Sequence, residues 1–218
     1  MALDTTDRAE LDRIVASVGD HAGLLKVGMG AYATFGPRLI SELASTTSVF
    51  VDLKLHDIPM QVATATRALV DQGAALLTVH AAGGPEMIAA AVDAADAVPV
   101  VAVTILTSID DRGLAAIGMN GGAGENVVRL ATLAVDAGAA GVVCSPLETA
   151  RLRSYVGAQA LLVTPGIRSA TDALDDQART ATARDAVQAG ADVIVVGRPI
   201  TKAEDPAAAA TALIAEIS

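Results

Sequence analysis

The sequence predicts an α/β fold, a single (β/α)8 barrel domain (TIM barrel) over residues 1–218. Short runs rich in Val, Ile and Leu alternate with Ala-rich segments of helical period, which is typical of parallel strands joined by crossover helices. Eight such pairs fit into 218 residues, and no linker-like stretch divides the chain. An open doubly wound sheet is the alternative. It is disfavoured because the first strand–helix turn, residues 3–7, lacks the glycine-rich fingerprint of that fold.

Eight segments are predicted as strands because they are short, apolar and rich in β-branched residues. They are residues 1–4, 24–29, 49–55, 76–80, 98–106, 141–144, 160–164 and 192–197. Helices are predicted near residues 7–18, 36–46, 60–73, 85–96, 124–138, 147–156, 182–190 and 203–217. Three of these helices end in a glycine directly before the next strand (Gly73, Gly138 and Gly190), which suits a left-handed helix cap.

Composition and charge exclude several classes of function. The net charge of -10 disfavours a general nucleic-acid-binding surface, so no nucleic-acid partner is expected. The single cysteine, Cys144, excludes an intramolecular disulfide and a zinc cage of cysteines, and its apolar surroundings predict an inert core residue. No stretch resembles a signal peptide or is long enough to span a bilayer. We therefore expect a cytoplasmic protein without a membrane partner.

The segment from Phe50 to Pro59 reads as a buried strand that carries charged residues. Asp52 and Lys54 lie two residues apart, so on a strand both side chains point to the same face, and Asp57 follows where the strand ends. Burying a carboxylate and an ammonium costs free energy unless the two groups pair or serve chemistry. A purely structural ion pair is the alternative to a catalytic one.

Polar residues also fall at the ends of the other predicted strands, where active sites of such barrels gather. They are Asp4, His80, Thr107, Ser108, Arg168 and Arg198, and Lys26 lies within the second predicted strand. The loops after strands seven and eight form the usual phosphate site of the fold, and here they contain Gly166 and Gly197 beside the arginines. The long polar segment 168–181 is interpreted as a lid over a phosphate, with Gln177 as the residue that reaches it.

Eight short motifs, in their order along the chain, resemble those of the orotidine 5'-phosphate decarboxylase family, and the resemblance covers nearly the whole chain. They are Ala2-Leu3-Asp4, Leu25-Lys26-Val27-Gly28, Asp52-Leu53-Lys54-Leu55-His56-Asp57-Ile58-Pro59, Thr78-Val79-His80-Ala81, Leu106-Thr107-Ser108, Pro165-Gly166-Ile167-Arg168, Asp176-Gln177 and Gly197-Arg198-Pro199. The Asp-x-Lys-x-x-Asp-Ile-Pro element is the most specific of them. The resemblance implies a barrel homodimer that converts orotidine 5'-phosphate to UMP and carbon dioxide, the last step of UMP biosynthesis, without metal or organic cofactor.

The resemblance also implies roles for individual residues. Lys54 would donate the proton to C6 of the pyrimidine, Asp52 would lie beside the substrate carboxylate, and Lys26 would extend the charge network. Asp57 would reach the active site of the partner subunit, near the ribose. The remaining substrate-binding residues implied are Asp4 at the ribose hydroxyls, Thr107 and Ser108 at the base, Gln177, Gly197, Arg198 and Arg168 at the phosphate, and also Ile58 and Pro165. Met60-Gln61 replaces the Asn-Thr pair that is common in the family.

Three other functions stay open on the sequence. A related sugar-phosphate decarboxylase or synthase would hold magnesium through a Glu on strand two, where this chain has Lys26. A Schiff-base aldolase would need a neutral lysine, whereas nearby carboxylates favour the charged form of Lys54. A catalytically silent phosphate binder would not need the Asp52 and Lys54 pair. The sequence favours the decarboxylase over all three.

Overall fold

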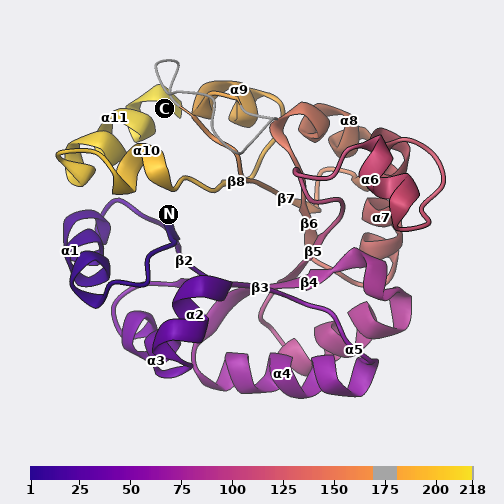
Figure 1. Cartoon of the computed structure of the whole chain (residues 1–218), viewed down its shortest axis with the longest axis horizontal. Coiled ribbons are helices and arrows are strands. Elements are labelled where there is room, and N and C mark those ends of the chain that lie inside the picture. Colours follow the sequence, from indigo (N-terminus) through magenta and orange to yellow (C-terminus); the bar gives the residue numbers. More distant parts are fainter. Residues whose placement is uncertain (169–180, 218) are drawn as a thin grey trace.

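The computed structural model describes residues 1–168 and 181–217 of the chain. Eight parallel strands form one sheet in sequence order: β1 (Ala2–Leu3), β2 (Leu25–Gly28), β3 (Val49–Leu55), β4 (Ala74–His80), β5 (Val100–Val103), β6 (Gly141–Val143), β7 (Leu161–Thr164) and β8 (Val193–Ile194). The sheet closes on itself, since the Ala2 N–H donates a hydrogen bond to the Val196 carbonyl oxygen at 2.7 Å. Figure 1 shows the strands in the middle of the molecule and the helices around them. The predicted (β/α)8 barrel is confirmed.

The helices of the outer layer follow the strands in turn. They are α1 (Arg8–Val18), α2 (Met29–Phe35), α3 (Arg38–Ala44), α4 (Pro59–Asp71), the 3-10 helix η1 (Ala81–Gly83), α5 (Pro85–Ala95), α6 (Asp111–Ala116), α7 (Ala123–Asp136), α8 (Pro146–Val156), α9 (Ala183–Gln188), α10 (Arg198–Thr201) and α11 (Pro206–Ile217). The glycine caps predicted at Gly73, Gly138 and Gly190 all have positive φ, as expected. The first and last long helices, α1 and α11, pack against each other beside the point where the barrel closes.

Side chains of each strand divide between two layers because they alternate in direction. Val49 and Val51 of β3 belong to the large core between strands and helices, whereas Phe50 joins the second buried cluster. That cluster consists of Phe50, Leu76, Val101 and Val163, and it fills the inside of the barrel below the carboxyl ends of the strands. Cys144 is buried, as predicted, and burial raises the pKa of its thiol to about 11.

The structure differs from the sequence prediction at several elements. Helices α2 and α6 and the 3-10 helix η1 were not predicted; α2 begins at Met29, which the prediction placed at the end of a strand. A local signal for α6 exists, because the Asp110 carboxylate caps it by accepting a hydrogen bond from the Gly113 N–H at 2.8 Å. Strand β5 ends at Val103 rather than at residue 106, since the Thr104 side chain, not a ladder partner, bonds the Val143 carbonyl oxygen.

Candidate active site

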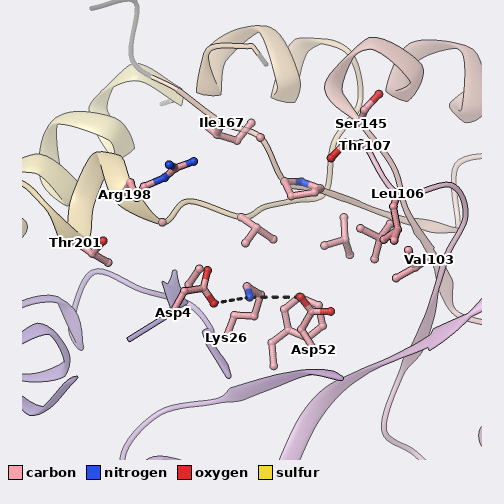
Figure 2. A pocket seen from close by; sticks show the side chains of 18 of the residues that line it. Asp4, Lys26, Asp52, Val103, Leu106, Thr107, Ser145, Ile167, Arg198 and Thr201 are labelled. Atoms are coloured by element: carbon pink, nitrogen blue, oxygen red, sulfur yellow. Dashed lines mark hydrogen bonds and ion pairs between the residues drawn. The ribbon is translucent and has the colours of Figure 1, made fainter. Parts of the chain in front are cut away.

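A cavity of about 500 Å³ opens at the carboxyl ends of the strands, inside the ring of loops that follows them. Nine of the predicted site residues line it: Asp4, Lys26, Asp52, Lys54, Thr107, Pro165, Arg168, Gly197 and Arg198. Figure 2 shows five of them arriving from separate elements, with Asp4, Lys26 and Asp52 on one side and Arg198 of α10 and Thr107 across the cavity. Residues far apart in the sequence therefore meet where the barrel fold places its chemistry.

Four charged side chains form an alternating row along one wall of the cavity. The Lys26 ammonium lies 3.2 Å from Asp4 Oδ1 and 3.3 Å from Asp52 Oδ2, and these contacts are drawn in Figure 2. The Lys54 ammonium donates a hydrogen bond to Asp52 Oδ1 at 2.8 Å. The prediction that Asp52 and Lys54 share one face of the strand is confirmed, and Lys26 joins them from the neighbouring strand β2.

Asp52 is the most buried acid of this row, with a side chain only 14% exposed. Burial alone would raise the pKa of its carboxyl group. The charges of Lys26 and Lys54, with hydrogen bonds from Lys54 and Thr78, outweigh burial and hold the pKa of Asp52 below its usual value. Asp52 is therefore an anion at neutral pH and balances the two ammonium groups beside it.

Lys54 has an unusual backbone for a residue in a strand. Its φ is 51°, in the left-handed region, and the pairing of β3 with β4 shifts register between Val51 and Leu55. A non-glycine residue in this region costs on the order of 1–3 kcal/mol and is typical of functional sites. The irregularity re-aims the side chain, as bulges do beside active sites. With this backbone, Lys54 lines the cavity and its ammonium lies 2.8 Å from Asp52 Oδ1.

The lining of the cavity is locally positive although the chain is acidic. Five lining residues are cationic (Lys26, Lys54, Arg168, Arg198 and Lys202) and three are anionic (Asp4, Glu10 and Asp52). Arg168 and Arg198 follow β7 and β8, the position predicted for an anion site. The Arg168 N–H donates a hydrogen bond to the Ala181 carbonyl oxygen at 3.0 Å, so the two ends of the predicted lid segment lie together. Gln177 lies outside the described residues.

Other predicted residues do not line this cavity. Asp57, Ile58 and Ser108 are exposed and lie outside it. His80 also lies outside it: its Nδ1 accepts a hydrogen bond from the Ala82 N–H, and its ring stacks on His56 with centroids 5.3 Å apart. The cavity of their own chain therefore does not include Asp57 and Ile58, for which the resemblance implies roles at the substrate.

The structure adds residues that the sequence prediction did not select. Thr201 of α10 lines the cavity beside Arg198, and Ser145, which follows β6, lines it near Thr107 (Figure 2). Thr201 could have been predicted from the sequence, because it lies three residues after Arg198 in the predicted phosphate loop. Thr78 is buried in β4 and bonds both Lys54 and Asp52, and no local pattern marks it.

Among the described residues, no group of three or more His, Cys, Asp or Glu side chains is arranged to hold a metal ion. The two cavity carboxylates of the charged row, Asp4 and Asp52, are instead bridged by the Lys26 ammonium. No described helix combines the length and apolar character needed to cross a membrane.

Comparisons with known proteins agree with this geometry. The model of the orotidine 5'-phosphate decarboxylase / HUMPS family matches residues 1–213. The orotidine 5'-phosphate decarboxylase of Thermobifida fusca is 51% identical over 100% of this chain and 94% of the relative. That of an Anaeromyxobacter species is 54% identical over 98% of this chain and 95% of the relative.

A solved structure gives the same result for the fold. The crystal structure of orotidine 5'-phosphate decarboxylase from Lactobacillus acidophilus superimposes with a TM-score of 0.90 at 39% identity, over 100% of this chain and 97% of that chain. Sequence and structure thus agree over the full length, and the chain belongs to the orotidine 5'-phosphate decarboxylase / HUMPS family.

Proposed function

We propose that this protein decarboxylates orotidine 5'-phosphate to UMP and carbon dioxide in pyrimidine biosynthesis, with Lys54 as the proton donor to C6. The observation that carries the proposal is the row of Lys26, Asp52 and Lys54 in the cavity wall of a chain of this family. Its full-length relatives bear the name of this activity, which supports the same substrate here.

The chemistry of the reaction explains why such a row is useful. Loss of carbon dioxide leaves an electron pair on C6 in the plane of the ring, where conjugation cannot spread it. A fixed ammonium directed at C6 stabilises the developing negative charge and then donates its proton. Lys54 supplies that group, and Asp52, 2.8 Å from it, fixes its position. Because the proton from Lys54 takes up the electron pair on C6, the proposal includes no metal or organic cofactor.

The far side of the cavity suits the phosphate of the substrate. Arg198 and Arg168 supply guanidinium groups, which pair well with phosphate oxygens, and Thr201 offers a hydroxyl beside Arg198. Binding energy from the distant phosphate can be expressed at the reacting carbon. Asp4, at the other end of the charged row, takes the ribose hydroxyls, and Thr107 faces the base.

A sugar-phosphate enzyme of the same family is the competing function. Such relatives would place a magnesium ion among the carboxylates. Here the Lys26 ammonium lies 3.2 Å from Asp4 and 3.3 Å from Asp52, so a fixed cation already occupies the space between the two acids. Charge repulsion from Lys26 disfavours a divalent ion at that place. This observation supports the decarboxylase.

The active site is completed by a second copy of the chain in this proposal. Asp57 and Ile58 lie outside the cavity of their own chain and are exposed, which suits residues that serve a neighbouring subunit. Exposed apolar side chains flank them: Met29 begins α2 and Met60 lies in the first turn of α4. Because β2 and β3 are neighbours in the sheet, these positions lie at adjacent carboxyl ends and form one surface on which the partner can pack.

The first test is the ultraviolet absorbance of orotidine 5'-phosphate mixed with purified protein and a metal chelator. We expect steady conversion to UMP at a rate that the chelator does not change. Conversion that stops on addition of chelator would favour the metal-dependent relatives. No conversion by a folded protein that still binds UMP would overturn the proposed substrate.

The role of Lys54 is tested by Lys54→Ala. We expect turnover to fall below detection, because the proton donor is gone, while UMP binding measured by calorimetry stays close to that of the wild type. Thr66→Val is a suitable control, since Thr66 is buried in α4 and its hydroxyl has no hydrogen-bond partner among the described residues. Turnover near the wild-type rate in Lys54→Ala would disprove the assigned role.

A further inference from the structure

The side chain of Thr78 links the backbone N–H of Lys54 to the carboxylate of Asp52, which also binds the Lys54 ammonium. The Lys54 N–H donates a hydrogen bond to Thr78 Oγ1 at 2.8 Å, and Thr78 Oγ1 donates to Asp52 Oδ1 at 3.1 Å. The Lys54 ammonium donates to the same Oδ1 atom at 2.8 Å. The three residues therefore form a closed ring of hydrogen bonds that includes both the main chain and the side chain of Lys54.

The directions of these hydrogen bonds are fixed by chemistry. A backbone N–H only donates, and an ionised carboxylate only accepts. The Thr78 hydroxyl must therefore accept from Lys54 and donate its one hydrogen to Asp52. A side chain that lacks either ability, such as valine, cannot replace it, whereas serine can.

The ring of hydrogen bonds lies where the regular hydrogen bonding between β3 and β4 is interrupted. The left-handed backbone at Lys54 interrupts the pairing of β3 with β4 between Val51 and Leu55. The Lys54 N–H thus takes a side-chain acceptor, which compensates for the ladder bond and keeps a partly buried donor satisfied. Thr78 is 1% exposed and does not line the cavity, so it acts on the substrate only through its neighbours.

We infer that Thr78 is a positioning residue for the proton-transfer step: its hydroxyl holds the left-handed turn at Lys54 and aims Asp52 at the Lys54 ammonium. This inference rests on the proposed role of Lys54. The strained backbone places the ammonium, and the hydroxyl stabilises that backbone. The proposed phosphate-binding residues Arg168 and Arg198 follow β7 and β8, so phosphate binding does not pass through Thr78.

The test compares Thr78→Val with Thr78→Ser. Valine keeps the shape of threonine but removes both hydrogen bonds, and we expect kcat to fall about 10²-fold because the ammonium is displaced from C6. KM for orotidine 5'-phosphate and the affinity for UMP should stay within about twofold, since the phosphate contacts remain. Serine restores the hydroxyl, so Thr78→Ser should keep kcat within a few-fold of the wild type.

Two controls separate positioning from general loss of structure. Thr66→Val removes another buried hydroxyl, one that no residue in the described part of the chain bonds, and should leave kcat and KM unchanged. If Thr78→Val does not fold, Thr78→Cys takes its place, because a thiol has similar volume and only weak hydrogen-bonding ability.

Four results would decide the inference. A wild-type kcat in Thr78→Val or Thr78→Cys overturns it, and so does a loss in Thr78→Ser as large as that in Thr78→Val, because the hydroxyl is then not what matters. A rise in KM with unchanged kcat also overturns it. If Lys54→Ala itself keeps turnover, the proposed role of Lys54 fails first, whatever the Thr78 variants do.

Discussion

At the scale of single residues, the charged row depends on the absence of a side chain at Gly28. A Cβ atom at Gly28 would lie 3.0 Å from Asp4 Oδ1 and 3.2 Å from the Lys26 ammonium nitrogen. The glycine therefore leaves the space in which these two groups meet at 3.2 Å. Gly28 is also paired in register with Asp52, so it lies at the centre of the charged row.

Gly28→Ala should separate Asp4 from Lys26 without removing either charge. We expect kcat/KM for orotidine 5'-phosphate to fall at least about tenfold, because a charge-assisted contact is weakened and Asp4 is moved from its proposed position at the ribose. Gly30→Ala is the matched control, since a Cβ atom there would meet no atom of another described segment within 4 Å. Equal kinetics in the two variants would show that the space at Gly28 is not needed.

At the scale of elements, the barrel relies on close approach between neighbouring strands. Strand β6 begins at Gly141, which is paired in register with Leu161 of β7. A Cβ atom at Gly141 would lie 2.0 Å from the Leu161 carbonyl oxygen, so backbone would have to move to admit it. The glycine at the start of β6 thus allows the two strands to pair on the side of the barrel opposite the charged row.

Gly141→Ala should destabilise the fold by about 3 kcal/mol, because the overlap is with main chain and not with a side chain that can rotate. Urea unfolding followed by circular dichroism measures the change. At Gly23, before β2, an added Cβ would meet no described residue beyond its chain neighbours within 4 Å, so Gly23→Ala should be close to neutral. A stability of Gly141→Ala equal to that of the wild type would mean that β6 and β7 separate more easily than their register indicates.

At the scale of the whole molecule, a single chain presents an incomplete site if Asp57 acts across an interface. In that arrangement each site uses Lys54 of one subunit and Asp57 of the other. Mixing two inactive variants then restores part of the function, since a hybrid dimer contains one site with both residues intact and one with neither.

Co-expression of Lys54→Ala with Asp57→Ala tests this arrangement. Random pairing should recover about a quarter of wild-type activity, although each variant alone is inactive. If Asp57 served its own chain, every site in the mixture would lack one group and no activity would return. Size-exclusion chromatography of the wild type at low concentration checks that a dimer forms.

The sequence by itself determined the barrel and the central pair of the site. Alternating apolar segments give the order of strands and helices because strand and helix periods are local properties. Asp52 and Lys54 could be placed on one face for the same reason, as the period of a strand is two. The arginines followed from their positions at strand ends, which parallel topology brings to one edge.

Only the tertiary structure decided how Lys54 is held. Thr78 lies 24 residues from Lys54 and 26 from Asp52, so no local pattern connects its hydroxyl with them. The left-handed turn at Lys54 is equally invisible in the sequence, because lysine has no preference for that conformation and adopts it only when its surroundings compensate for the strain. Contacts between strands set these features, and such contacts depend on register, which period alone does not specify.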